Sequence, residues 1–245
     1  MPEGPVLIIE QSFQKAWIAA AKKLEQSDWE IQTLMVTMQD STLFDEELHK
    51  NFIDFAEDNG LIKPKDVAYT IFPHKLYDRC KNADKLFEEY NREKGLYDRL
   101  RKRPHRGWGT YFRRMTYYDL REGNIENQLD NIIKAINARK RIHKAAYTVV
   151  ISKPGGETIK PLGGPCLNYL TIQLHANPKK IDILALYRNH DFLERAYGNY
   201  WGLCNLLRFM ANEINFYPGS LTCVSSHAYV ASKKGTFKIF VDSLS

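Results

Sequence analysis

Apolar side chains recur every three to four positions in five stretches of the chain. This spacing gathers them on one face of a helix, so each stretch predicts a helix. The helices are expected over Ser12–Glu25, Asp45–Asp58, Asp78–Arg103, Asn127–Ile136 and Tyr197–Ile214. The last stretch is apolar nearly all round, which is typical of a helix buried in the core.

Shorter apolar stretches that alternate with polar residues, or that are rich in β-branched side chains, predict strands. They are expected over Val6–Ile9, Glu30–Met38, Ala145–Ser152, Leu167–His175, Lys179–Tyr187, Leu221–Val230 and Phe237–Val241. Tyr217-Pro218-Gly219 predicts a turn before the sixth of these strands. Because helices and strands are interspersed, the sequence predicts an α/β (α+β) fold, with a large mixed β-sheet and packed helices around the central buried helix Tyr197–Ile214.

The length of the chain bounds the number of domains. With 245 residues, of which 44% are hydrophobic, it can bury one sizeable core, and no internal repeat or linker divides it. A single domain over residues 1–245 is therefore expected. The formal net charge of +6 favours anionic ligands such as nucleotide phosphates, polyglutamyl tails or nucleic acid, although cations that only keep the surface soluble explain it equally well.

The chain contains no segment that predicts a membrane or export. No apolar run approaches the ~18–20 residues that span a bilayer, and no basic segment precedes the first apolar stretch as in a signal peptide. The four cysteines are Cys80, Cys166, Cys204 and Cys223, and none forms a C-x-x-C pair. Such usage is typical of a reducing compartment, so a cytoplasmic protein with free thiols is expected.

Four short segments in the second half carry residue types that chemistry uses. They are Pro165-Cys166, Tyr187-Arg188-Asn189-His190-Asp191, Gly198-Asn199 and His227-Ala228-Tyr229. Each is weak alone, because a cysteine in an apolar stretch is more often a buried small hydrophobe than a nucleophile. Together they resemble the thymidylate synthase family, which has Pro-Cys, a Tyr-x-Arg-Ser-x-Asp-type segment, an asparagine opening the central helix and a later His-x-Tyr. The resemblance covers residues 145 to 230.

The resemblance implies a thymidylate synthase-like fold and transfer of a one-carbon unit to C5 of a pyrimidine nucleotide. Cys166 is then the catalytic nucleophile that adds to C6 as a thiolate. Arg188, on a neighbouring strand, is expected to lower the pKa of that thiol and to bind the phosphate with its planar fork. Asn199 is expected to hydrogen-bond O4 and N3–H of uracil, since relatives that act on cytosine tend to carry aspartate there.

Further binding residues and partners follow from the same resemblance. His227 and Tyr229 are expected to contact the sugar hydroxyl, and Asp191 is expected near the pterin ring of a folate. The implied ligands are a pyrimidine nucleoside monophosphate and 5,10-methylenetetrahydrofolate, the latter as the cofactor. The family is dimeric, so a homodimer is expected.

The chain departs from the family at the phosphate site. The family has an arginine pair that reaches across the dimer to the phosphate bound by the partner. Here that pair falls on Ala145 and Ala146. Arg141, His143 and Lys144 stand close by, and Arg141 and Lys144 are expected to bind the phosphate in a shifted register.

Other departures concern the base and the folate. The residue after the nucleophile is Leu167, where synthases usually have histidine, and leucine there is closer to pyrimidine hydroxymethylases. Arg195 replaces a glycine beside the folate site. Trp108 stands roughly where the family has an active-site tyrosine, and it is expected at the cofactor site. The proton-relaying glutamate has no match, since Glu88 and Glu89 lie in a charged helix and are expected in solvent.

Three hypotheses remain open. The chain is a folate-dependent enzyme that methylates a uracil nucleotide, or one that hydroxymethylates a cytosine nucleotide. Alternatively, it is an inactive relative that binds a nucleotide or a partner protein. In the third hypothesis it binds RNA, through Arg101–Arg106 and Arg113-Arg114 with Trp108, Tyr111 and Phe112 between them. The enzyme is favoured, because an inactive copy has no reason to keep the whole set of site residues, and nucleic acid is the less favoured partner.

Overall fold

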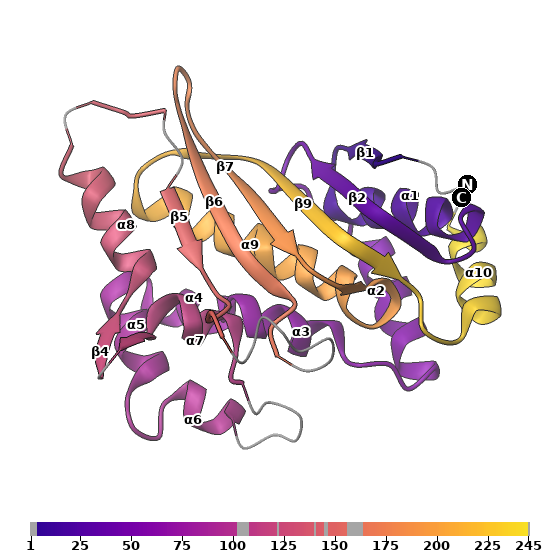
Figure 1. Cartoon of the computed structure of the whole chain (residues 1–245), viewed down its shortest axis with the longest axis horizontal. Helices are drawn as coiled ribbons and strands as arrows, with labels where there is room; N and C mark the ends of the chain where they lie inside the picture. Colours follow the sequence, from indigo (N-terminus) through magenta and orange to yellow (C-terminus); the bar gives the residue numbers. More distant parts are fainter. Residues whose placement is uncertain are drawn as a thin grey trace.

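The computed structural model describes residues 4–101, 108–121, 123–139, 141–144, 147–155 and 164–244. Within these ranges the chain forms a seven-stranded mixed sheet, a two-stranded sheet and a set of packed helices (Figure 1). The mixed sheet with its helices confirms the α/β class that the sequence predicts.

The large sheet has the strand order β1-β2-β9-β7-β6-β5, and β8 pairs with the end of β9. Its strands are β1 (Val6–Glu10), β2 (Glu30–Met38), β5 (Tyr147–Val150), β6 (Leu167–Ala176), β7 (Lys179–Tyr187), β8 (His190–Asp191) and β9 (Tyr217–Tyr229). β1–β2, β7–β9 and β8–β9 are parallel, whereas β2–β9, β5–β6 and β6–β7 are antiparallel. The start of β6 and the ends of β7, β8 and β9 therefore meet at one end of the sheet.

Helices pack against one face of this sheet. In Figure 1, α9 lies behind β7 and β9, and α1 lies behind β2. The helices are α1 (Phe13–Gln26), α2 (Glu46–Asp58), α3 (Pro64–Ile71), α4 (His74–Cys80), α5 (Ala83–Asn91), α6 (Leu96–Arg101), α7 (Tyr111–Thr116), α8 (Gln128–Asn137), α9 (Tyr197–Glu213) and α10 (Lys234–Ser243). A π-helical turn, Phe192–Ala196, leads from β8 into α9, and β3 (Tyr118–Arg121) pairs with β4 (Asn124–Glu126). Of the helices described, none is long and apolar enough to cross a bilayer.

Capping side chains begin three helices where the sequence predicts them. Ser12, Asp45 and Asn127 each accept a backbone N–H from the first turn of the following helix. These bonds satisfy donors that the helix itself leaves without a partner. The predicted helices that begin at these residues are confirmed as α1, α2 and α8.

The central helix α9 is buried on almost every side, as its apolar sequence predicts. Two glycines let α3 pack directly on it. A methyl group at Gly198 would lie 2.6 Å from the carbonyl oxygen of Pro64, and one at Gly202 would lie 2.8 Å from that of Ala68. Since glycine leaves this space free, α3 comes close enough for its side chains to face the start of α9.

The single helix expected over Asp78–Arg103 is wrong. α4 ends at Cys80, because Lys81 adopts the left-handed conformation with φ of 54°. Asn82 is extended and caps the next helix, so α5 and α6 follow as separate helices. A left-handed residue followed by an extended cap reverses the chain and cannot continue a helix.

Two expectations near the C-terminus are also wrong. The turn expected at Tyr217-Pro218-Gly219 belongs to β9, because a bulge against β7 lets the strand continue past the proline. There the backbone N–H of Ser220 donates to Oδ1 of Asp182 at 2.7 Å. The strand expected over Phe237–Val241 lies in α10, where its first and last residues, four positions apart, are both buried on one helix face.

Candidate active site

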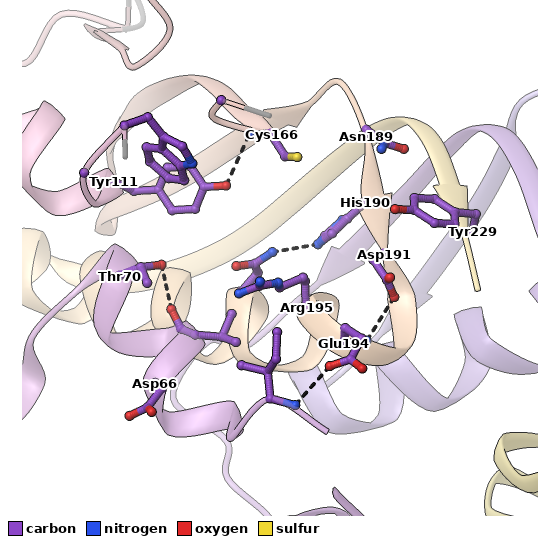
Figure 2. Close-up of a pocket in the computed structure, with 16 residues that line it drawn as sticks. Asp66, Thr70, Tyr111, Cys166, Asn189, His190, Asp191, Glu194, Arg195 and Tyr229 are labelled. Atoms are coloured by element: carbon purple, nitrogen blue, oxygen red, sulfur yellow. Dashed lines mark hydrogen bonds between the residues drawn. The ribbon is translucent and has the colours of Figure 1, made fainter. Parts of the chain in front are cut away.

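A cavity of about 520 Å³ lies at the end of the sheet where β6 begins and β7, β8 and β9 end. This volume is within the range of about 300–1,000 Å³ that is usual for small-molecule sites. Figure 2 shows Cys166 and Tyr111 on one side, and Asp66 and Thr70 of α3 on the other. The other lining residues are Ile62, Val67, Trp108, Gly109, Gly164, Asn189, His190, Asp191, Glu194, Arg195, Asn199 and Tyr229.

Five of the residues predicted to act in catalysis or binding line this one cavity. They are Trp108, Cys166, Asp191, Asn199 and Tyr229. They come from the start of β6, from β8, from the end of β9, from the first turn of α9 and from the segment before α7. The topology of the sheet brings them together, and their chemical roles remain predictions.

Arg188 lies directly beside the loop that carries Cys166. In the antiparallel ladder of β6 and β7, Leu167 pairs with Tyr187. Cys166, just before Leu167, therefore lies beside Arg188, which follows Tyr187. The backbone N–H of Arg188 donates to the carbonyl oxygen of Cys166 at 2.9 Å, and its Nε donates to that of Pro165 at 3.2 Å. Arg188 thus holds the Cys166 loop in place from the end of the neighbouring strand β7, and its contact with a phosphate remains a prediction.

Tyr111 also supports the Cys166 loop, through a contact that the sequence did not reveal. Its hydroxyl oxygen accepts the backbone N–H groups of Cys166 at 3.3 Å and Leu167 at 3.4 Å. Burial raises the pKa of Tyr111 to about 12, so the phenol is neutral at physiological pH and keeps a hydrogen to donate. The sequence signal that could have indicated Tyr111 is its position three residues after Trp108. In the structure the centroids of the two rings lie 4.8 Å apart.

The expected lowering of the Cys166 pKa is not found in the chain by itself. Burial raises the pKa of this thiol above the ordinary value of 9.0. The guanidinium groups of Arg188 and Arg195 lower it and the carboxylate of Asp191 raises it, but burial is the largest influence. The thiol is therefore protonated near neutral pH, because the two neighbouring cations do not outweigh its desolvation.

Three charged residues lie together on the π-helical turn and the strand before it. Oδ1 of Asp191 accepts the backbone N–H of Glu194 at 3.0 Å and so caps this turn. Oε2 of Glu194 accepts the backbone N–H of Ile62 at 2.9 Å, which joins the turn to the segment before α3. Burial raises the pKa of the Asp191 carboxyl, and Arg195 projects into the cavity beside it (Figure 2).

A buried hydrogen-bonded chain stands behind Asn199. Nδ1 of His190 lies 2.9 Å from Oγ of Ser225, and its Nε2 lies 3.0 Å from the amide nitrogen of Asn199. Burial lowers the pKa of His190 to about 3, so the imidazole is neutral at physiological pH. The sequence analysis gave neither His190 nor Ser225 a role, since only the sheet register shows that they meet.

Tyr229 and His227 occupy different places although they are only two residues apart. Tyr229 lines the cavity, whereas His227 lies beside it with its ring stacked on that of Tyr229, 5.0 Å between centroids. Nδ1 of His227 bonds Oδ1 of Asn189 at 2.7 Å, and its Nε2 bonds a carboxylate oxygen of Glu30 at 2.9 Å. His227 therefore reaches the cavity through Asn189, which is a lining residue.

The two expected phosphate ligands from the region before β5 lie elsewhere in this chain. Arg141 lines a second hollow of about 480 Å³ near the far end of β6, together with Arg139, His143 and Lys179. Lys144 lines neither hollow. Because the expected contact crosses a dimer, a single chain does not test it, and the positions matching the family's arginine pair lie outside the described residues.

The glutamates of the charged helix are away from the cavity, as expected. Glu88 is exposed, and Glu89 forms an ion pair with Arg92 at 2.8 Å on the surface of α5. An acidic residue that does line the cavity is Asp66, which lies on α3. No helix was predicted there, so the sequence analysis missed this acidic group.

In the basic segment of the RNA hypothesis, the described arginines form hydrogen bonds within the protein. Nη1 of Arg113 donates to Oδ1 of Asn91 at 2.7 Å, and the buried Arg114 donates to the carbonyl oxygen of Trp108 at 3.0 Å. Tyr111 and Phe112, immediately before these arginines, are buried. Residues 102–107 lie outside the described part of the chain. Bases cannot stack on buried rings, so this segment gives little support to RNA binding.

Comparison with known proteins agrees with the resemblance seen in the sequence. The chain is 26% identical over 121 residues to a protein of Methanococcoides burtonii described as "Putative thymidylate synthase". The chain is similar to a thymidylate synthase. The match covers 49% of this chain and 52% of the relative, so the chain spans about half the length of the curated relative it matches. No protein-family model matches the chain.

Proposed function

We propose that the chain is a thymidylate synthase-like enzyme that transfers a one-carbon unit to C5 of a uracil nucleotide. One observation carries this proposal. The thiol of Cys166 and the amide of Asn199, from separate elements, line a single cavity large enough for a nucleotide. The distant similarity to a thymidylate synthase supports the same reaction class.

Cys166 makes C5 reactive in this mechanism. C5 of a pyrimidine is a poor nucleophile, but addition of the Cys166 thiolate at C6 converts the ring into an enolate. C5 then attacks the one-carbon electrophile and loses its proton. The one-carbon unit separates from its carrier, a hydride or water adds to the exocyclic carbon, and release of the Cys166 thiolate restores the ring. Since burial raises the pKa of Cys166, the thiol must give up its proton as the nucleotide binds.

Asp66 is well placed to move protons in these steps. It is the acidic residue that α3 contributes to the lining of the cavity, across from Cys166 and Tyr111. A carboxylate within the cavity can exchange a proton with the ring oxygen through a bridging water. We assign Asp66 the proton-relay role for which the sequence offered no residue.

The nucleotide is held by side chains around Cys166. Arg188 binds the phosphate, a task that suits a planar guanidinium. Asn199 pairs with the edge of the base. Tyr229 and His227 bind the sugar hydroxyl, the first directly and the second with the help of Asn189, to which it is bonded.

The residues present fit a reduced folate above the nucleotide. The half-buried carboxylate of Asp191 is an acceptor for the N–H groups of a pterin ring, and the indole of Trp108 offers an aromatic face for stacking. Arg195 adds a cation on the same side. When bound, 5,10-methylenetetrahydrofolate supplies the one-carbon unit and, for methylation, a hydride.

A second candidate function is hydroxymethylation at C5, as in pyrimidine hydroxymethylases that act on dCMP or CMP. The observation that favours it is Leu167, which is fully buried next to the nucleophile where synthases usually carry a histidine. The Cys166 chemistry is the same up to the last step, in which water rather than a hydride adds to the exocyclic carbon. The two functions differ in the product and in the base, uracil or cytosine, on which the enzyme acts.

Tritium release from C5 tests the reaction directly. The substrates are dUMP, UMP, dCMP and CMP labelled at C5, each with and without methylenetetrahydrofolate. We expect release from a uracil nucleotide only when the folate is present, and mass analysis of the product distinguishes methyl from hydroxymethyl. No release from any of the four, in a protein shown to be folded, would contradict the enzyme and favour a binding role.

We also propose that the chain forms a homodimer through the sheet face away from α9. Along β7 and β9, buried residues alternate with half-exposed ones, and the half-exposed set includes Leu184, Leu186 and Val224. Burying this apolar face stabilises an assembly. Light scattering after size exclusion is expected to give twice the mass of the chain, and a monomer would count against a phosphate site shared between subunits.

A further inference from the structure

His190 is a buried histidine that the proposed chemistry does not use. Only 1% of its surface is exposed. Its ring stacks on Tyr187 with 4.1 Å between centroids and 4° between planes, and the rings of Phe192 and Tyr200 meet it at steep angles. Aromatic packing on three sides leaves the imidazole no room to turn.

Both ring nitrogens of His190 have partners that restrict its protonation. A neutral imidazole carries one N–H donor and one acceptor nitrogen. The amide nitrogen of Asn199, 3.0 Å from Nε2, can only donate, so Nε2 is the acceptor. Nδ1 therefore carries the hydrogen and donates it to Oγ of Ser225 at 2.9 Å.

This bond determines which edge Asn199 presents to a ligand. One hydrogen of its amide goes to His190. The second hydrogen and Oδ1 lie together on the remaining edge of the amide, which thus offers a donor beside an acceptor. That edge complements the N3–H and O4 of uracil, whereas the N3 acceptor and 4-amino group of cytosine require the amide to be reversed.

Reversal of the amide would disturb the whole buried chain. It would set Oδ1 of Asn199 against the acceptor Nε2 of His190. Relief would require the hydrogen of His190 to move to Nε2 and the hydroxyl of Ser225 to turn and donate. We infer that His190, oriented by Ser225, is a positioning residue that holds Asn199 in the orientation that selects uracil over cytosine. This inference rests on the proposed nucleotide site.

Binding constants for dUMP and dCMP isolate the effect, because these ligands share sugar and phosphate and differ at the base edge. Calorimetry on the wild type is expected to show dUMP binding at least about 10-fold tighter than dCMP. In His190→Asn the shorter amide can reach Ser225 but not Asn199. In Ser225→Ala the imidazole stays but its Nδ1 loses its partner. Both variants should lose most of the preference for dUMP.

Two further variants serve as controls. His190→Gln places an amide oxygen near the position of Nε2, where it can accept from Asn199, so it should keep more of the preference than His190→Asn. Ser226→Ala, at an exposed position next to Ser225 on β9, should keep all of it. Thermal melting establishes that each variant is folded before its binding constants are compared.

The possible failures are distinguishable. If the wild type binds neither nucleotide, the proposed nucleotide site is wrong, and the inference is wrong with it. If the wild type binds both but His190→Asn and Ser225→Ala keep its dUMP preference, only the inference is overturned. Nitrogen NMR of the ligand-free chain gives an independent check: it should find the hydrogen of His190 on Nδ1, and a hydrogen on Nε2 would contradict the inference without any nucleotide.

Discussion

Replacing Cys166 by alanine is expected to abolish tritium release from C5 while nucleotide binding persists. Without the thiol no bond forms at C6, so C5 never gains the electron density that it needs to react. Removal of a catalytic nucleophile lowers kcat by about 10³-fold or more. The Kd for the nucleotide should change little, because the phosphate, sugar and base contacts come from other side chains.

Cys80→Ala is the matched control for this variant. Cys80 is also a partly exposed free thiol, but it does not line the cavity. Its substitution should leave tritium release at the wild-type rate, which shows that loss of a thiol elsewhere has no effect. Release by Cys166→Ala at a rate close to that of the wild type would rule out covalent addition at C6.

The free energy of unfolding is expected to fall as the pH is lowered from 6.5 to 3, and His190 should cause much of the fall. Burial lowers the pKa of His190 from 6.5 to about 3 in the folded chain. Between these values the unfolded chain binds a proton that the folded chain does not, so acid favours unfolding. Each pH unit in this window costs about 1.4 kcal/mol, and His190 contributes about 5 kcal/mol at most.

Other groups also titrate between pH 3 and 6.5, so the test compares the wild type with the variant His190→Gln. Burial lowers the pKa values of His49 and His74, which act in the same direction as His190. It raises the pKa of Asp191, which acts in the opposite direction. In His190→Gln these groups remain and only the imidazole is lost. Its stability curve against pH should therefore be shallower than that of the wild type by up to about 1.4 kcal/mol per pH unit.

Urea unfolding from pH 4 to pH 7 measures both curves. Glutamine at a buried position lowers stability at every pH, which displaces the curve of the variant without changing its slope. The slope is therefore the quantity to compare. Curves that run parallel throughout this range would show that His190 is not buried as a neutral imidazole in the folded state.

Most of the secondary structure could be predicted because it depends on local features. The helices after Ser12, Asp45 and Asn127 begin at capping side chains, and their apolar residues repeat at helical spacing. The strands Glu30–Met38 and Lys179–Tyr187 have the expected bounds. Buried and less buried residues alternate to the end of each, with one interruption at Thr33. Caps and periodicity are properties of neighbouring residues, so they can be read without the rest of the molecule.

The wrong predictions arose where distant contacts or backbone conformation outweighed local pattern. The charged stretch 78–103 has helical composition throughout, but left-handed Lys81 divides it. Phe237–Val241 resembles a strand in composition, yet in the structure it belongs to the helix α10. There Phe237 packs against Trp17 of α1 and against Trp29, which follows α1. Packing against a core can override the modest propensities of a short segment.

The sequence by itself determined the α/β class, the central helix and, through the resemblance, which side chains to seek at one site: Cys166, Asn199, Asp191 and Tyr229. Only the tertiary structure decided what surrounds them. It brought in Asp66 and Tyr111, set His190 behind Asn199, and raised rather than lowered the pKa of the Cys166 thiol. Burial and hydrogen bonding between distant segments control these properties, and neither is expressed in the order of neighbouring residues.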